Sequence, residues 1–297
     1  MLLSFACLAL AAVATIAFWP LIGPAVAHAA EGLGRISPEL LVLSGALFAA
    51  APIFCGLAWR DAIVRAGGNV GRVDACARYG VGSFVNSVAP VHLGDVVRAV
   101  LLLEKLPAGG RRRIVPWFGV IQGARLAALV ALAIAATLPG LLAFLALLVP
   151  GALVVATLGR GTTRLVLLAF VSPLAKAAAI AVVLVGLDVG SPLDAMAVVP
   201  ALELAALIPL TPGNVGVAGA AASGALYAQG LPMSTAVQAG LALHAIETAA
   251  GLTYGTASAL AWLAGLGPVR GVAGGWRALR SAVLPATRGV QPEAGGP

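Results

Sequence analysis

Six apolar runs follow one another along this chain, and each is about as long as a helix needs to be to cross a membrane. They lie at about residues 2–27, 40–59, 114–137, 141–157, 165–187 and 235–264. About 20 apolar residues cross the hydrocarbon core of a bilayer as a helix. The pattern therefore predicts an all-α polytopic membrane protein with six spanning helices.

Two further apolar stretches, 79–103 and 195–228, are interrupted near their middle by proline, glycine and polar residues. The interruptions are the segments 87–95 (SVAPVHLGD) and 209–216 (PLTPGNVG). Backbone groups freed by such breaks must be satisfied by protein or by water, so we expect the breaks inside the helix bundle. Each stretch is predicted to be a re-entrant, Pro/Gly-broken helical hairpin, with an ordinary kinked span as the alternative.

The positions of the basic residues distinguish these two alternatives. If both stretches are re-entrant, one face carries loops 60–78, 104–113 and 158–164 and the tail 266–297, with 14 of the 18 lysines and arginines, and the opposite face carries only Arg35. If each stretch crosses once, the two faces hold 8 and 7. Basic loops favour the cytoplasm, so the first arrangement is predicted, with both termini cytoplasmic in a bacterial-type inner membrane. The hairpins then enter from opposite sides, as in the inverted repeats of transporters.

The composition agrees with a membrane protein and excludes other classes. Apolar residues make up 61% of the 297 positions and charged residues 10%, whereas about a quarter are charged in soluble domains. A soluble enzyme, a disordered tail and a nucleic-acid-binding module are therefore excluded. The three cysteines and three histidines lack metal-ligand spacing, and no nucleophile or phosphate-loop motif occurs. We therefore predict no metal, no cofactor and no enzymatic activity.

The two ends of the chain differ from its central part. Ala27-His28-Ala29 is similar to a signal-peptide cleavage site, but no basic segment precedes the apolar run, so a retained N-terminal helix is predicted. From Gly265 onward, glycine, proline and arginine replace the apolar pattern. Residues 1–265 are expected to form the transmembrane domain and residues 266–297 a basic, flexible cytoplasmic tail near the anionic leaflet.

The first break carries candidate residues for binding an anionic head-group. Pro90 ends one half-helix, and Gly94 and Asp95 begin another, whose free N–H groups favour an anion. Arg98 lies one turn further on, where it can pair with Asp95 or bind a phosphate through two donors. His92 is either a further donor to the ligand or a hydrogen-bonded histidine of a packed loop.

The second break repeats this pattern with smaller residues. Pro212, Gly213, Asn214 and Gly216 precede a helix of small residues that begins at Val217. Glycine lets a head-group approach backbone donors closely, so these residues are candidates for the same binding site. The alternative is a Gly/Ala interface between closely packed membrane helices.

Ionisable residues within the apolar stretches are the costliest feature of the sequence. Arg125, Lys176 and Glu247 lie near the centres of three spanning runs, and Glu203 lies within the second interrupted stretch. Such a charge costs about 2.5–3.5 kcal/mol on insertion. Either the four residues pair with one another, or the cations bind a lipid phosphate while a carboxylate exchanges a proton. Gln122 precedes Arg125 by three residues and is expected to line the same cavity.

Two motifs resemble the signatures of a known family of membrane proteins. The residues at 59–60 (WR), 79–86 (YGVGSFVN) and 90–98 (PVHLGDVVR) are similar to the first signature of the flippase-like family that contains the transmembrane region of lysylphosphatidylglycerol synthases. The segment 209–216 resembles the second signature of that family. Order and spacing agree over about residues 45–260.

The resemblance implies an integral inner-membrane protein that moves a phospholipid or a polyprenyl-linked lipid between leaflets. It implies lipid-site roles for Pro90, Gly94, Asp95, Arg98, Pro212, Gly213 and Gly216. The chain departs from the family's pattern at His92 and at Ala218-Gly219. The soluble aminoacyl-transfer domain of the full synthases is absent from the sequence, so lysyl-lipid synthesis is not expected.

A lipid flippase is therefore the leading hypothesis. An anionic head-group would pass between the two broken segments while its tails stay in the bilayer. One alternative is a non-catalytic membrane protein that scaffolds a lipid-modifying enzyme through its basic loops, above all through the arginines at 111–113. The other alternative is a secondary transporter of a small soluble anion.

Overall fold

The chain folds into a bundle of helices, seen in a computed structural model that describes residues 27–88, 93–138, 162–207 and 216–262 and the isolated positions 24, 142, 145–147, 149, 150, 152, 156 and 264. Every regular element in this part is helical. The elements are α2 (Pro38–Arg65), α3 (Arg72–Val88), α4 (Leu93–Leu103), α5 (Gly110–Ala135), α7 (Thr163–Leu187), the short 3-10 helix η1 (Pro192–Asp194), α8 (Ala195–Ala205), α9 (Val217–Ala228) and α10 (Met233–Ala261). The expected N-terminal helix at 2–27, most of the run at 141–157 and the tail at 266–297 lie outside the described residues.

Three of the described helices, α2, α5 and α7, are long and apolar enough to cross a membrane. They contain 28, 26 and 25 residues, which correspond to about 38–42 Å of helix, more than the thickness of the hydrocarbon core of about 30 Å. These helices indicate a membrane protein. Helix α10 has 29 residues but is less apolar, since Gln238, His244 and Glu247 interrupt it. The predicted count of six spans stays a prediction.

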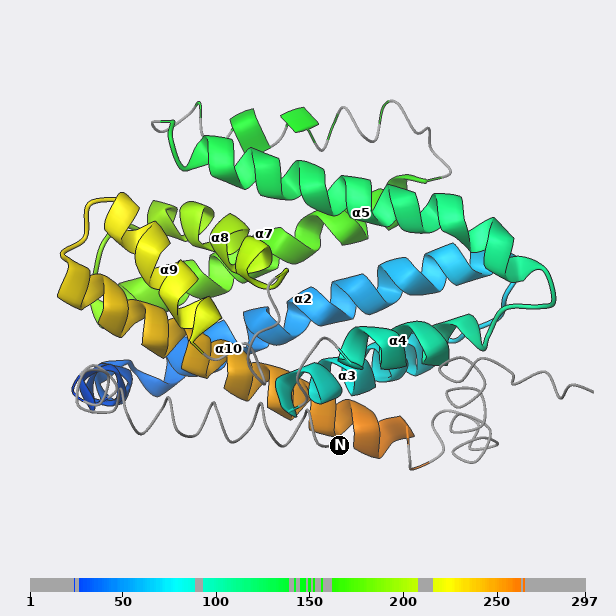
Figure 1. Ribbon diagram of the computed structural model, residues 1–297, viewed down its shortest axis with the longest axis horizontal. Coiled ribbons are helices and arrows are strands. Elements are labelled where there is room, and N and C mark those ends of the chain that lie inside the picture. The colour runs from blue at the N-terminus through cyan, green and yellow to red at the C-terminus, as the bar shows by residue number, and fades with distance from the viewer. Residues whose placement is uncertain are drawn as a thin grey trace, which may run out of the picture.

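Helices α2 and α7 run antiparallel through the middle of the bundle, as Figure 1 shows. Small and hydroxyl residues let them approach closely: Ser44 Oγ donates to the carbonyl oxygen of Ala179 at 3.3 Å. Further along, Ser172 Oγ donates to the carbonyl oxygen of Ala51 at 3.0 Å. Such contacts are typical of helix association in membranes, where small residues and hydroxyl hydrogen bonds replace the hydrophobic effect.

Each interrupted stretch forms two helices, as its pattern predicts. Helix α3 ends at Val88 and α4 begins at Leu93, whereas α8 ends at Ala205 and α9 begins at Val217. Figure 1 shows the α3–α4 pair towards one end of the bundle and the α8–α9 pair towards the other. The two pairs therefore lie on opposite sides of its middle.

The predicted loops at 60–78 and 104–113 are wrong in their extent. Helix α2 continues to Arg65 and α3 begins at Arg72, so only a short connection separates them. Asp74 and Arg78 lie one turn apart and pair at 2.7 Å, which stabilises the early turns of α3. Similarly, α5 begins at Gly110, so the arginines at 111–113 form its first turn.

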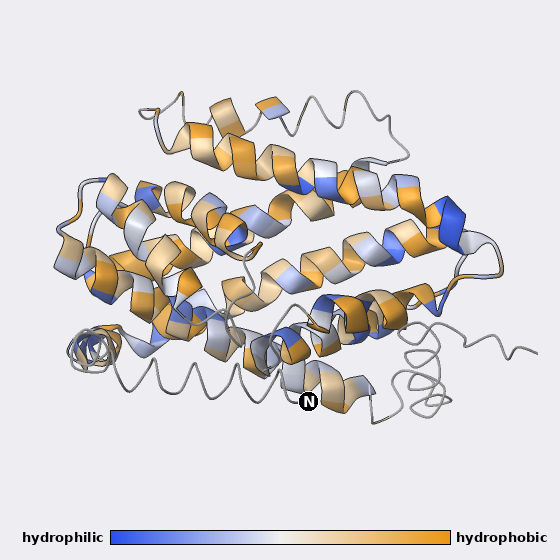
Figure 2. Cartoon of the chain, viewed as in Figure 1, coloured by the Kyte–Doolittle hydropathy of each residue, from blue (hydrophilic) through white to orange (hydrophobic). Residues whose placement is uncertain are grey.

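Basic residues gather at one end of the bundle. Figure 1 shows the last turns of α2 and α4 and the first turns of α3 and α5 together at this end, and Arg164 at the start of α7 joins them through an ion pair of 3.3 Å with Asp61. In Figure 2 this end is strongly hydrophilic at the start of α5. Asp188 and Asp194 lie instead where α7 ends and α8 begins. The gathering of Lys and Arg at one end is what the positive-inside rule uses to orient a membrane protein.

Candidate functional site

Four ionised side chains from four helices form a network halfway along the bundle, here called the central network: Arg125 (α5), Lys176 (α7), Glu203 (α8) and Glu247 (α10). Glu203 accepts from Arg125 Nη2 and from Lys176 Nζ, both at 2.9 Å. Lys176 Nζ also lies 3.1 Å from Glu247 Oε1. Of the two alternatives that the sequence left open for these residues, the structure shows mutual pairing.

The central network lies between two separate apolar clusters. One cluster includes Ile63, Leu102 and Ile121 at the basic end of the bundle. The other includes Ile180 and Leu243 at the opposite end. Apolar surroundings strengthen ion pairs but penalise any charge that loses its partner. The pairing of these side chains is therefore tightly coupled: a change in one partner affects the others.

The side chains of the central network are only partly enclosed. Their exposed fractions lie between 17% and 27%. By contrast, the side chain of Arg78, an ion-paired residue of α3, is 3% exposed. Among the described residues, the side chains of the central network are therefore more accessible than the guanidinium of Arg78.

Arg98 of α4 is held by a second polar group, contributed by α3. Its guanidinium lies over the ring of Tyr79, 3.8 Å from the ring centroid, a favourable cation–π position. The same guanidinium donates to Tyr79 Oη at 3.1 Å and to Ser83 Oγ at 3.3 Å. It pairs with Asp95 at 3.1 Å, and Asn86 Nδ2 donates to that carboxylate at 3.0 Å.

Glycines place Arg98 against α3. A Cβ atom on Gly94 would meet the carbonyl oxygen of Gly82, and a Cβ atom on Gly82 would lie 2.6 Å from Cβ of Arg98. The backbones of α3 and α4 are therefore in direct contact, which only glycine permits at this crossing.

Glycines also bring α3 close to α10 on its other side. A Cβ atom on Gly80 would collide with the side chain of Ser258, and one on Gly255 would lie 2.7 Å from Cβ of Phe84. Helix α3 is therefore in close contact with two helices.

The group around Arg98 and the central network lie on helices that pack together. Helix α3, whose side chains hold Arg98, contacts α10, and α10 carries Glu247. Together the two groups contain three cations (Arg98, Arg125 and Lys176) and three carboxylates (Asp95, Glu203 and Glu247). The six side chains are formally neutral as a set, which avoids the cost of unbalanced charge within apolar surroundings.

Several buried polar atoms near this site have no hydrogen-bond partner among the described residues. They are Asn86 Oδ1, Arg98 Nε and both ring nitrogens of His244, which lies one turn before Glu247 on α10. Buried polar groups are normally satisfied, so atoms of this kind mark positions where water or a ligand group is accommodated.

The structure brings together only part of the residues predicted to bind a ligand. Gly94, Asp95, Arg98, Arg125, Lys176, Glu203 and Glu247 belong to the site described above. Gln122 is exposed on α5, and no side-chain hydrogen bond joins it to the residues of this site among those described. Gly216 caps α9 with a φ of 63°. The remaining predicted residues, Pro90, His92, Pro212, Gly213 and Asn214, lie outside the described residues.

Sequence reasoning did not assign individual roles to Tyr79, Ser83 and Asn86. Their spacing of four and three residues places them on one face of a helix. An antiparallel hairpin with its break near Pro90 brings that face opposite Arg98 and Asp95. The sequence therefore shows that these three residues share a helix face, but their contact with Arg98 becomes evident only when the two helices are paired.

The comparisons with known proteins identified no relative of this chain. No family model, no curated protein and no solved structure matches this chain. Within the described part of the chain, no group of three or more His, Cys, Asp or Glu residues is placed to hold a metal ion.

Proposed function

We propose that this protein carries an anionic, phosphate-bearing lipid across the membrane through the middle of its helix bundle. The observation that carries the proposal is the central network, an ionised and partly exposed group halfway along apolar helices. Each such charge costs about 2.5–3.5 kcal/mol in the bilayer core. If the contact between these helices were purely structural, apolar side chains would serve as well as ionised ones. If it were a structural ion-pair network, its side chains would be expected to be fully buried.

The arrangement of the cations suits a phosphate group. Glu203 holds the guanidinium of Arg125 and the ammonium of Lys176 at 2.9 Å each, so both donors converge on one point. A phosphate oxygen has the charge and acceptor geometry to replace a carboxylate oxygen there. Lipid binding would then free Glu203, and Glu247 would keep its contact with Lys176. Arg98, on the α3–α4 pair that packs against α10, would supply a further donor.

We infer that the α3–α4 and α8–α9 pairs are re-entrant hairpins that enter the bilayer from opposite sides. Helices α4 and α8 contain 11 residues each, about 16 Å of helix, which is too short to cross a hydrocarbon core of about 30 Å. In Figure 1 the α3–α4 pair opens towards the basic end of the bundle and the α8–α9 pair towards the other end. With the basic end in the cytoplasm, both termini are cytoplasmic.

The membrane that fits this proposal is a bacterial-type inner membrane, and the cargo is a phospholipid or a polyprenyl-linked lipid. Both expectations come from the resemblance to the flippase-like family. We propose an anionic cargo because each of the three cations is paired with a carboxylate, whose place a phosphate can take.

Transport by the purified protein in liposomes tests this function. The probe is a fluorescent phosphatidylglycerol, whose arrival in the inner leaflet protects it from a membrane-impermeant quencher. Lys176→Met and Arg125→Gln are each expected to reduce the rate of lipid transport at least tenfold, because each removes a hydrogen-bond donor to the phosphate. Arg164→Gln, which removes a cation at the basic end of the bundle, is the matched control and is expected to transport normally.

Unchanged transport in both Lys176→Met and Arg125→Gln would contradict the proposed site. Wild-type protein that moves phosphatidylglycerol and polyprenyl phosphate no faster than protein-free liposomes do would contradict the function itself. Size-exclusion chromatography of every variant separates loss of transport from loss of folding.

A further inference from the structure

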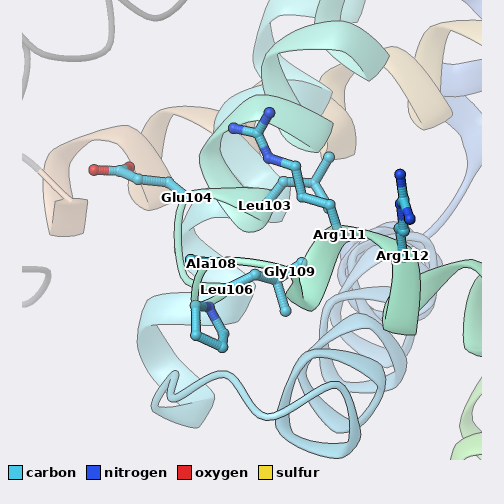
Figure 3. A pocket seen from close by; sticks show the side chains of 8 residues that line it. Leu103, Glu104, Leu106, Ala108, Gly109, Arg111 and Arg112 are labelled. Carbon is cyan, nitrogen blue, oxygen red and sulfur yellow. The ribbon is translucent and has the colours of Figure 1, made fainter.

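A hollow of about 510 Å³ lies at the basic end of the bundle, where α4 passes into α5. This volume lies within the range of small-molecule sites, about 300–1,000 Å³. Leu103, Leu106 and Pro107 form an apolar part of its lining, and Arg111 and Arg112 form a cationic part. Figure 3 shows both arginines rising from the start of α5 beside the connection that carries the apolar residues. The hollow shares no residue with the central network.

The arginines of this hollow lie where helix electrostatics disfavour them. They belong to the first turn of α5, which contains no acidic residue, and Gly109 provides no side-chain cap. The N-terminal turn of a helix carries a partial positive charge, so cations there are destabilising by some tenths of a kcal/mol and anions are stabilising. Arg113 follows directly and adds to the repulsion. An anion in the hollow would relieve both effects.

The nearest carboxylate does not supply that anion. Glu104 also lines the hollow, but its Oε2 atom pairs with Arg78 at 3.1 Å. In Figure 3 the side chain of Glu104 extends away from Arg111 and Arg112. No carboxylate among the described residues forms an ion pair with either arginine. Their charge is therefore available to a ligand.

The lining and the position together define the ligand. Two guanidinium groups match the oxygens of a phosphodiester, which Arg binds through paired donors. The apolar residues beside them suit a glycerol backbone and the first carbons of acyl chains, which inorganic phosphate lacks. The hollow lies at the end of helices long enough to cross the membrane, and in the arrangement proposed above that end meets the lipid head-groups. We propose that it holds the head-group of an anionic phospholipid between Arg111, Arg112 and the apolar wall, independently of transport.

Binding measurements on the purified full-length protein test this site. The probe is short-chain phosphatidylglycerol titrated into detergent micelles, with bound lipid counted by native mass spectrometry and the melting temperature recorded in parallel. Arg112→Gln and Arg113→Gln form a matched pair, because each removes one charge from the same turn of α5 and only Arg112 lines the hollow. We expect Arg112→Gln to weaken binding of one lipid at least fivefold, and Arg113→Gln to change it less than twofold.

Three results would overturn the proposal: equal weakening by both substitutions, equal binding of phosphatidylcholine, and full competition by inorganic phosphate at the same concentration. The first would indicate diffuse surface charge, and the third a site for a free anion. Both arginines are exposed, so neither substitution is expected to prevent folding. The Lys176→Met variant, which disables the central network, is expected to bind lipid in the hollow with wild-type affinity. Failure of the transport proposal and failure of this site can therefore be distinguished.

Discussion

Two charge clusters of this protein contain similar residues but are built differently. The central network joins four separate helices, and its side chains are 17% to 27% exposed. The other cluster, here called the end cluster, consists of Asp74, Arg78, Glu104 and Lys105 in the α3–α4 pair and the turn that follows α4. Each cluster contains two cations and two carboxylates.

The end cluster closes a hairpin. Arg78 donates to Asp74 at 2.7 Å and to the carbonyl oxygen of Leu101 at 2.7 Å, and its side chain is 3% exposed. All of its partners lie within the same helix or in the segment that pairs with it. A cluster of this kind stabilises one local arrangement: its hub Arg78 is closed to a ligand, whereas Glu104 at its edge is exposed and lines the hollow described above.

Residue type therefore does not distinguish a structural ion pair from a binding site. The number of helices that the charges connect and the exposure of their side chains do distinguish them. Charges that link distant helices and remain accessible can exchange partners with a ligand, whereas charges enclosed within one hairpin can only be broken at a cost in stability.

Loss of the hub of the end cluster is expected to have the largest effect on stability. Arg78→Gln leaves the carbonyl oxygen of Leu101 without its donor and Asp74 with Lys105 as its remaining cation, which is expected to lower the free energy of unfolding by about 3–5 kcal/mol. Unfolding in mixed micelles with increasing sodium dodecyl sulfate measures this change. Arg72→Gln, at an exposed position on the same helix, is the control, and equal destabilisation by both substitutions would remove the distinction between hub and surface.

Loss of the shared carboxylate of the central network is expected to cost less stability and more transport. Glu203→Gln leaves Arg125 and Lys176 with one partner fewer each, and because the site is partly exposed the expected loss is about 2 kcal/mol. Glu247→Gln affects only Lys176 and is expected to be milder. The measurements are the same detergent titration and the liposome assay. A larger effect of Glu247→Gln would show that Glu203 does not organise the network.

The smallest effect is expected at the edge of the end cluster. Lys105 Nζ lies 3.3 Å from Asp74, which is already held by Arg78. Lys105→Gln is therefore expected to lower the free energy of unfolding by only about 0.5–1 kcal/mol, the range of partly exposed pairs, and to leave lipid transport unchanged. Impaired transport in this variant, with its stability intact, would mean that the end cluster also has a part in function.

The sequence alone predicts the long helices well. The runs at 40–59, 114–137 and 165–187 correspond to α2, α5 and α7 with ends displaced by a few residues, because the apolar pattern that defines a span is local. The start of α3 could not be read in the same way. The turns at 72–78 are rich in polar residues, and the burial of Arg78 there depends on its contacts with Leu101 and Glu104 of the α4 segment, which a local pattern does not contain.

The candidate site is predictable in its members but not in its contacts. The cost of an ionised residue in an apolar run is visible in the sequence, so Arg125, Lys176 and Glu247 stand out. Which carboxylate meets which cation depends on how helices far apart in sequence pack together, and a single sequence does not contain that information. For the same reason, the contact of Arg98 with Tyr79 follows only from the packing of α3 on α4.

The glycine contacts of α3 have a mechanical consequence. Helix α4 meets α3 at Gly82 and Gly94, and α3 meets α10 at Gly80 and Gly255, where a larger residue would force the helices apart. The three helices are therefore expected to move together, so that a displacement of Arg98 on α4 would also shift Glu247 on α10.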